Sequence, residues 1–324
     1  MNNKFKQVFI ISIFLWLIAE GPLLGYAIRL RKFIRYSDNK EICLISDWHQ
    51  SGKYLSKSQK QFLKTLEDLD KTEEKVDLFW ELGNRKDPED QIKKYYGTTP
   101  ESNKLNYGPF IGLKGYYLSK KNFQNLIFTD IDSQRDDLLS ELIFAPDKAK
   151  LYMNVPVSRV ENFIKKIENN EYLKTKLTKI KNENDHNYLN LKLLHLEQAT
   201  RKAYTQTIVP QIKKYNIRSV GELIEKKLPL IWCIFPEGLE NSITSLNITE
   251  LETLINIFSS SNKKHIVYVG EYHENNIVPE LEFLGFFNTY DSNTSYNIWG
   301  TPKELPSSIW NNLYLNKEEI KNCS

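Results

Sequence analysis

Cysteine is scarce in this sequence, and the three that occur form no metal-binding or disulfide pattern. Cys43, Cys233 and Cys323 are widely spaced, with no CxxC pair and no histidine at zinc-finger spacing. A zinc ribbon and a disulfide framework are therefore excluded. Cys43 and Cys233 each lie within an apolar run, so we expect both to be buried as small hydrophobic residues.

Signature motifs of several enzyme classes are also missing. The sequence contains no GxSxG, P-loop or GxGxxG motif, which removes the usual support for a serine hydrolase, a phosphate-loop enzyme or a dinucleotide-binding enzyme. A charge excess is missing as well, because 44 Lys and Arg against 41 Asp and Glu give a formal net charge of only +3. This surplus is too small to predict a nucleic-acid partner.

The composition that remains is that of a globular protein, with 40% hydrophobic and 26% charged residues. A chain of 324 residues can bury a substantial core in one large domain or two modest ones. A core of that size needs no disulfide or metal ion to stabilise it.

A mainly apolar run follows Lys4 and Lys6 near the N-terminus. It covers residues 8–19 and is ended by Glu20 and the Gly-Pro pair that follows. Such a run is too short to cross a bilayer, which takes about 20 residues, but it suits the hydrophobic region of a secretory signal with cleavage after Ala27. Residues 1–27 are therefore predicted to be a signal peptide or a membrane anchor.

A retained anchor would run from residue 8 to residue 28. Four basic residues would then lie on its membrane-proximal side, Arg29, Arg31, Lys32 and Arg35. Both forms predict an exported protein, periplasmic or extracellular, or one anchored to the membrane. The alternative is a cytoplasmic protein whose first helix is buried.

Residues 36–324 show the alternating pattern of an α/β domain. Short apolar runs bounded by polar residues predict strands at residues 41–45, 76–82, 126–130, 228–235 and 264–270. Amphipathic spacing over residues 56–71 predicts a helix, and lysine-rich helical spacing predicts a helical insert at about residues 157–227. This order favours a mainly parallel sheet flanked by helices.

Polar side chains follow four of these strands. They are Asp47 and His49, then Glu81, then Asp132 and Arg135, and finally Glu271 and His273. Ligands of parallel sheets bind outside the carboxyl ends of the strands, where these residues fall. The sequence therefore predicts one shared polar site.

Two kinds of residue in this set point to chemistry. An acid two residues before a histidine occurs at His49 and again at His273, which places an imidazole beside the cleft. Glu81 ends an apolar strand, where a carboxylate needs a cation, a metal or a proton, so it is a candidate general base. The alternative for Glu81 is a salt bridge to Arg85 or Arg135.

Three other histidines, His186, His195 and His265, are predicted to be structural, because they lie on an expected helix surface or inside an expected strand.

Short motifs in these segments resemble those of the superfamily of erythromycin esterase-like, ChaN-like and TraB/Tiki-like proteins. That pattern is a strand followed by GExH or GxxH, a glutamate after the next strand, and a late GxxH. The matching residues here are Ser46-Asp47-Trp48-His49, Glu81 and Gly270-Glu271-Tyr272-His273, and Asp130 to Asp132 with Arg135 is similar to an aspartate-containing strand end of these proteins. Ser46 and Asp47 stand where the pattern has glycine and glutamate.

This resemblance implies a hydrolase in which His49 and Glu81 activate water to cleave an ester or peptide bond in a small molecule or peptide. Asp47 and Arg135 would lie beside them as further catalytic residues. Alternatively, a divalent metal such as Zn, Mn or Fe would be held by His49, Glu81, His273, Asp132 and Glu271. Some relatives bind haem iron instead.

A second resemblance leads to another class. Asp47 and His49 also match the opening DxH of calcineurin-like metallophosphoesterases, and residues 83–85 faintly resemble their GNH block. Arg85 stands where a metal-binding histidine is expected, no GD block lies between, and two metals need enough ligands to fill both coordination spheres. A non-catalytic haem-binding, metal-binding or surface interaction protein is the third alternative.

Overall fold

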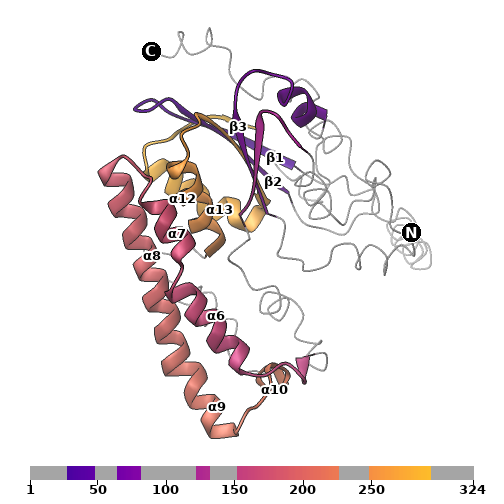
Figure 1. Cartoon of the computed structure of the whole chain (residues 1–324), viewed down its shortest axis with the longest axis vertical. Coiled ribbons are helices and arrows are strands. Elements are labelled where there is room, and N and C mark those ends of the chain that lie inside the picture. Colours follow the sequence, from indigo (N-terminus) through magenta and orange to yellow (C-terminus); the bar gives the residue numbers. More distant parts are fainter. Residues whose placement is uncertain (1–27, 48–63, 82–121, 132–151, 226–247, 293–324) are drawn as a thin grey trace, which may run out of the picture.

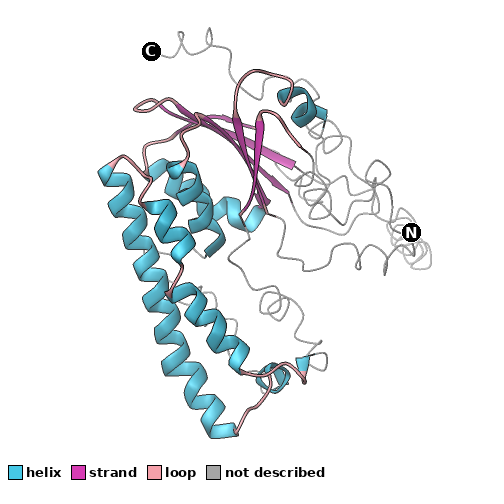
Figure 2. Cartoon of the chain, in the orientation of Figure 1, coloured by secondary structure: helices cyan, strands magenta, loops and turns pink. Residues whose placement is uncertain are grey.

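The computed structural model describes residues 28–47, 64–81, 122–131, 152–225 and 248–292. These ranges form a mixed six-stranded sheet with helices packed against it, so the chain has an α/β fold (Figures 1 and 2). The expected signal peptide or anchor at residues 1–27 and the expected strand at residues 228–235 lie outside the described residues. Within the described ranges, no helix combines the length and apolar character needed to cross a bilayer.

Four neighbouring strands of the sheet are parallel. The sheet order is β4-β3-β5-β2-β1-β6, and the parallel strands are β2 (Lys40–Asp47), β3 (Val76–Trp80), β4 (Leu126–Asp130) and β5 (Lys264–Gly270). They coincide with four of the predicted strands. Every residue of β3, which lies between β4 and β5, is buried, as expected for a parallel strand covered on both faces.

The antiparallel strand β1 (Ile28–Arg35) pairs with β2 on one side and with β6 (Phe287–Asp291) on the other. The described part of the sheet therefore includes Ile28–Arg35, which precede residue 36, the expected first residue of the domain. The four basic residues expected to flank a membrane anchor belong to this strand. Asn39, at φ 56°, takes the left-handed conformation in the turn from β1 to β2, a conformation that asparagine tolerates well.

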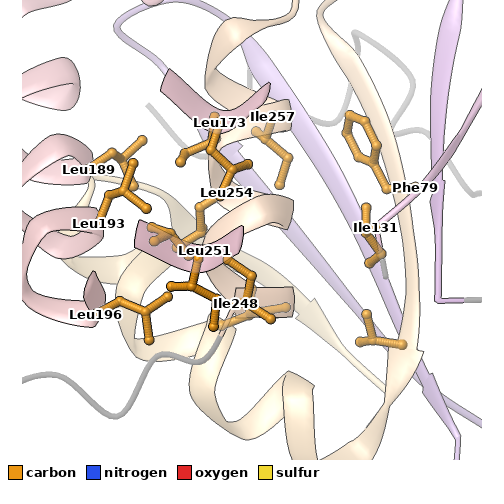
Figure 3. Packing of buried hydrophobic residues seen from close by; sticks show 14 of the residues in the cluster. Phe79, Ile131, Leu173, Leu189, Leu193, Leu196, Ile248, Leu251, Leu254 and Ile257 are labelled. Atoms are coloured by element: carbon orange, nitrogen blue, oxygen red, sulfur yellow. The ribbon is translucent and has the colours of Figure 1, made fainter. Parts of the chain in front are cut away.

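Two helices cover one face of the sheet, α12 (Ile248–Ser259) and α13 (Glu271–Phe283). Two more, α7 (Glu171–Leu177) and α8 (Glu183–Ala203), pack on the outer side of α12. Figure 3 shows Leu251 and Leu254 of α12 between the leucines of α8 and two residues on the sheet side, Phe79 of β3 and Ile131 just after β4. Because α12 is enclosed in this way, its residues from Ile248 to Phe258 are all buried.

The remaining helices extend away from the sheet (Figure 1). They are α6 (Ser158–Glu168), the π-helical turn η3 (Tyr204–Ile208), α9 (Val209–Tyr215) and α10 (Val220–Glu225). Pro210 lies at the start of α9 and cannot donate a backbone hydrogen bond, which accounts for the π-helical turn between α8 and α9. Two ion pairs tie α8 to the sheet and to α13, Arg35 with Asp185 at 2.8 Å and Lys192 with Glu280 at 2.9 Å.

The other face of the sheet carries a second apolar cluster. Trp80 and Tyr268 stack there with ring centroids 4.3 Å apart, and Leu66 from the helical residues 64–69 packs on the same cluster. Cys43 is buried in this cluster, which confirms the prediction that it serves as a small hydrophobic residue. Burial raises the pKa of its thiol to about 12.

The face beneath α12 and α13 is divided into three layers along the strands. Lys40, Asp77 and His265 form a polar layer at the amino ends of the parallel strands, and Ser46 and Glu81 belong to another at the carboxyl ends. The layer between them is apolar and contains Leu44, Phe79 and Val267. Apolar side chains therefore separate the two polar layers from each other.

Candidate functional site

Glu81 and His273 meet at the carboxyl edge of the sheet. Glu81 directly follows β3, and His273 lies in the first turn of α13, which begins where β5 ends. His273 Nε2 is 3.3 Å from Glu81 Oε1, and both side chains are less than a tenth exposed. Two of the residues predicted from strand ends are thus in direct contact, although 192 residues separate them in the sequence (273 − 81).

The backbone fixes the position of the Glu81 carboxylate. The Glu81 N–H donates to the Tyr268 carbonyl at 3.0 Å, which extends the pairing of β3 with β5 by one residue. The Gly270 N–H donates to Glu81 Oε2 at 2.8 Å. Gly270 is the N-cap residue of α13 and supplies no side-chain cap, so the carboxylate also lies at the positive end of this helix.

Glu250 is a third member of the group, and the sequence did not indicate it. Its Oε1 is 2.8 Å from His273 Nδ1 and also accepts a hydrogen bond of 3.1 Å from the Asn276 amide. Glu250 is completely buried in the first turn of α12. Glu250 is one of two acids in a segment rich in Ile and Leu, and an acid that is buried in such a segment needs a partner.

The two carboxylates set the charge of His273. Burial by itself lowers the pKa of this imidazole, but Glu81 and Glu250 outweigh burial and raise the pKa well above the usual 6.5. The two acids therefore favour the protonated form of His273, which lies between them. A buried imidazolium between carboxylates is an arrangement that can store and transfer a proton.

A second polar cluster adjoins the first. It is built around Glu274, the residue after His273 in α13, which faces β2 and β1. The Ser46 hydroxyl donates to Glu274 Oε2, and Glu274 Oε1 is 3.1 Å from Arg31 Nε and 3.6 Å from Arg29 Nε. Asp291 accepts two hydrogen bonds from Arg29, of 3.1 and 2.6 Å. Burial raises the pKa of Glu274, although the Ser46 hydroxyl and both guanidiniums act in the opposite direction.

The other predicted site residues are only partly described. Asp47 is the last residue of β2, and its backbone pairs with Gly270 of β5. Glu271 is the first residue of α13. The side chains of these two residues, and all of His49, Asp132 and Arg135, lie outside what the structure describes. Arg85, the alternative partner considered for Glu81, lies outside it as well.

A second histidine–carboxylate pair lies at the opposite edge of the same two strands. His265 Nδ1 is 3.1 Å from Asp77 Oδ2, and Asp77 also accepts hydrogen bonds from Ser260 at 2.5 Å and Asn262 at 2.8 Å. Burial lowers the pKa of His265, and these hydrogen bonds lower that of Asp77 despite its burial. The pair is enclosed and fully hydrogen-bonded, in keeping with the structural role predicted for His265.

Among the described residues, no group of three or more His, Cys, Asp or Glu side chains is arranged to hold a metal ion. Of the five expected metal ligands, Glu81 and His273 are the two whose side chains are described.

No protein-family model, curated protein or solved structure matches this chain.

Proposed function

We propose that this protein is a hydrolase whose reaction centre is the buried group of Glu81, His273 and Glu250 at the carboxyl edge of the sheet. The observation that supports this proposal is the contact of an ionisable carboxylate with an imidazolium that a second carboxylate holds in place. Such a group offers a proton acceptor and a proton donor within one contact, which is what hydrolysis of an ester or peptide bond requires.

In this mechanism Glu81 accepts a proton from the attacking water, while the His273 imidazolium donates a proton to the leaving group. The 3.3 Å contact between them allows the proton to return after each cycle. Glu250 does not meet the substrate, because it is completely buried. It acts as a positioning residue that fixes the His273 ring through Nδ1.

The resemblance to erythromycin esterase-like, ChaN-like and TraB/Tiki-like proteins adds further residues to this proposal. Asp47 ends β2, directly beside the strand that leads to His273, and His49 would follow it and polarise the same water. Arg135 would stabilise negative charge on the reacting carbonyl. The substrate would be a small molecule or a peptide that carries an ester or peptide bond.

A divalent metal, Zn, Mn or Fe, is compatible with the donor set. Glu250 occupies Nδ1 of His273, which is the support that a metal-binding histidine normally receives through its second nitrogen. Glu81, His273, His49, Asp132 and Glu271 would hold the ion, which would supply Lewis-acid activation of water when bound. Haem is the less favoured cofactor in this proposal.

Export or membrane anchoring through residues 1–27 belongs to the same proposal, as does the interpretation of residues 157–227 as a helical insert in the α/β domain. The helices α6 to α10 lie in sequence between β4 and α12. An insert at that place in the chain would enter and leave the domain without interrupting the pairing of β3 with β5.

A pair of matched substitutions, one directly after β3 and one within it, tests the proposed reaction. Glu81→Gln should reduce the turnover of ester and peptide substrates by about 100-fold or more, because it removes the proton acceptor but keeps the shape of the side chain. Asp77→Asn is the control, since Asp77 also contacts a histidine of the β5–α13 segment, but at the opposite edge. The control should lose stability and keep its activity per folded molecule.

Full activity of folded Glu81→Gln would refute the proposal. Metal analysis of the purified protein separates the two forms of the mechanism. A near-stoichiometric metal that is lost in His273→Ala supports the metal-dependent form, and its absence supports direct acid–base catalysis.

A further inference from the structure

The guanidinium of Arg31, on β1, contacts Glu274, the residue that follows His273 in α13. Its Nε is 3.1 Å from Glu274 Oε1 and 3.1 Å from Asp291 Oδ2. Within the ranges that the structure describes, no hydrogen bond or ion pair involves either of its Nη groups. The side chain is 13% exposed, and Nε is the atom through which the guanidinium contacts these two acids.

The contact of Arg31 with Glu274 is an ion pair without an aligned hydrogen bond. Arg31 Nε and Glu274 Oε1 are both buried, and neither has a hydrogen-bond partner, whereas buried polar atoms are normally hydrogen-bonded. Asp291 is already engaged by two hydrogen bonds from Arg29. The charge of Arg31 is therefore only partly balanced inside the protein. Its planar guanidinium can donate two parallel hydrogen bonds to one oxyanion.

Consecutive residues of α13 connect this guanidinium to the reaction centre. His273 faces Glu81 beyond the end of β3, and Glu274 faces Ser46 on β2 and Arg31 on β1. We propose that Arg31 binds an anionic group, a carboxylate or a phosphate, of the molecule that reacts at Glu81 and His273. The reaction rests on the function proposed above, but anion binding by Arg31 does not require turnover.

The test measures binding alone, with inorganic phosphate and acetate as probes. The purified full-length protein is titrated with each anion while the Nε–Hε NMR signals of its arginines are recorded, the Arg31 signal being assigned from its loss in Arg31→Gln. We expect a saturable shift of the Arg31 signal, and binding at least about tenfold weaker in Arg31→Gln. Arg201→Gln is the control, because it removes an arginine that pairs with Glu168 on the distant helices, and it should bind as the wild type does.

Tighter binding of phosphate would identify a phosphorylated substrate, and tighter binding of acetate a carboxylate. No saturable shift with either anion, or binding that survives in Arg31→Gln, would overturn the proposal. If Arg31→Gln does not fold, Arg31→Lys keeps the charge but loses the fork, and undiminished binding by this variant would overturn the proposal equally. A protein that binds both anions at Arg31 but hydrolyses nothing refutes the proposed reaction alone.

Discussion

Two carboxylate–histidine pairs lie at opposite ends of β3 and β5, and the pKa values of their histidines are shifted in opposite directions because their surroundings differ. His265 has one carboxylate neighbour, Asp77, and Lys40 Nζ lies 3.5 Å from its other ring nitrogen. His273 has a carboxylate at each ring nitrogen, Glu81 at Nε2 and Glu250 at Nδ1. Burial therefore prevails at His265 and lowers its pKa, whereas the two acids prevail at His273 and raise its pKa. The surroundings therefore favour the protonated form of His273 and the neutral form of His265.

Removing the second acid should reverse this balance at His273. In Glu250→Gln one of the two charges that raise the pKa of His273 is lost, while the burial that lowers it remains. We expect the pKa of His273 to fall and turnover to drop by about 10- to 100-fold, the range typical of residues that support a reacting histidine. NMR titration of the histidine ring nitrogens measures the first effect. Glu280→Gln, on α13 but paired with Lys192, should leave the pKa of His273 unchanged, and an unchanged pKa in Glu250→Gln would contradict this account.

Lys40 should contribute to stability through backbone carbonyls. Its Nζ donates to the carbonyls of Ile257 and Ser260 at 3.0 and 2.9 Å, at the C-terminal end of α12, where helix carbonyls lack partners. Burial lowers the pKa of Lys40 to about 8. Lys40→Met should cost about 2 kcal/mol in the free energy of unfolding, because buried acceptors are left without a donor. Lys263→Met removes an exposed contact with the Asp38 carbonyl and should reduce the free energy of unfolding far less. Urea denaturation of both variants measures the difference.

At the scale of helices and strands, α12 carries much of the core. Leu254 is completely buried on this helix, and Figure 3 shows it between α8 and the sheet. Leu254→Ala should reduce the free energy of unfolding by about 3 kcal/mol, from lost burial and the cavity that remains. Leu191→Ala on α8 is the control, because Leu191 is 51% exposed. Equal unfolding midpoints for the two variants would show that α12 is not a core helix.

The elements that could be predicted are those whose own residues carry the pattern. Strands β2, β3, β4 and β5 are apolar runs, and the rule that parallel strand ends meet was enough to bring Glu81 and His273 together. Strand β1 was missed because its apolar residues alternate with arginines, which resembled the flank of a membrane segment. Asp291, which accepts hydrogen bonds from Arg29, lies 262 residues further along the chain. No local pattern reveals such a partner.

Glu250 was missed for a related reason. Helix α12 was not predicted, and its polar residues, Glu250 among them, are buried together with its apolar ones. Its acid finds a partner through the packing of α12 beside α13. The parts of the candidate site that depend on strand ends could thus be predicted, and the part that depends on helix packing could not.

At the scale of the whole molecule, the two polar layers should give stability opposite dependences on pH. The pKa values of Asp77 and His265 are lowered in the fold from 3.8 and 6.5, so their contributions are present above those values and are lost as the pH falls through the folded values. The pKa of His273 is raised above 6.5, so its contribution is complete below 6.5 and is lost as the pH rises through the folded value. Acid should therefore weaken the amino edge of the sheet, and alkali the carboxyl edge.

Urea unfolding midpoints measured between about pH 4 and pH 10 should separate the two layers. Asp77→Asn should flatten the acid side of the wild-type profile, and His273→Gln the alkaline side. Lys40 has the opposite effect from His273 on the alkaline side. Its pKa is lowered in the fold from 10.5 to about 8, so its contribution to stability increases as the pH rises between those two values. The informative quantity is therefore the difference between wild type and His273→Gln, in which Lys40 cancels. If this difference does not shrink as the pH rises, His273 is not held as a cation between Glu81 and Glu250, and the proton donor of the proposed mechanism is lost with it.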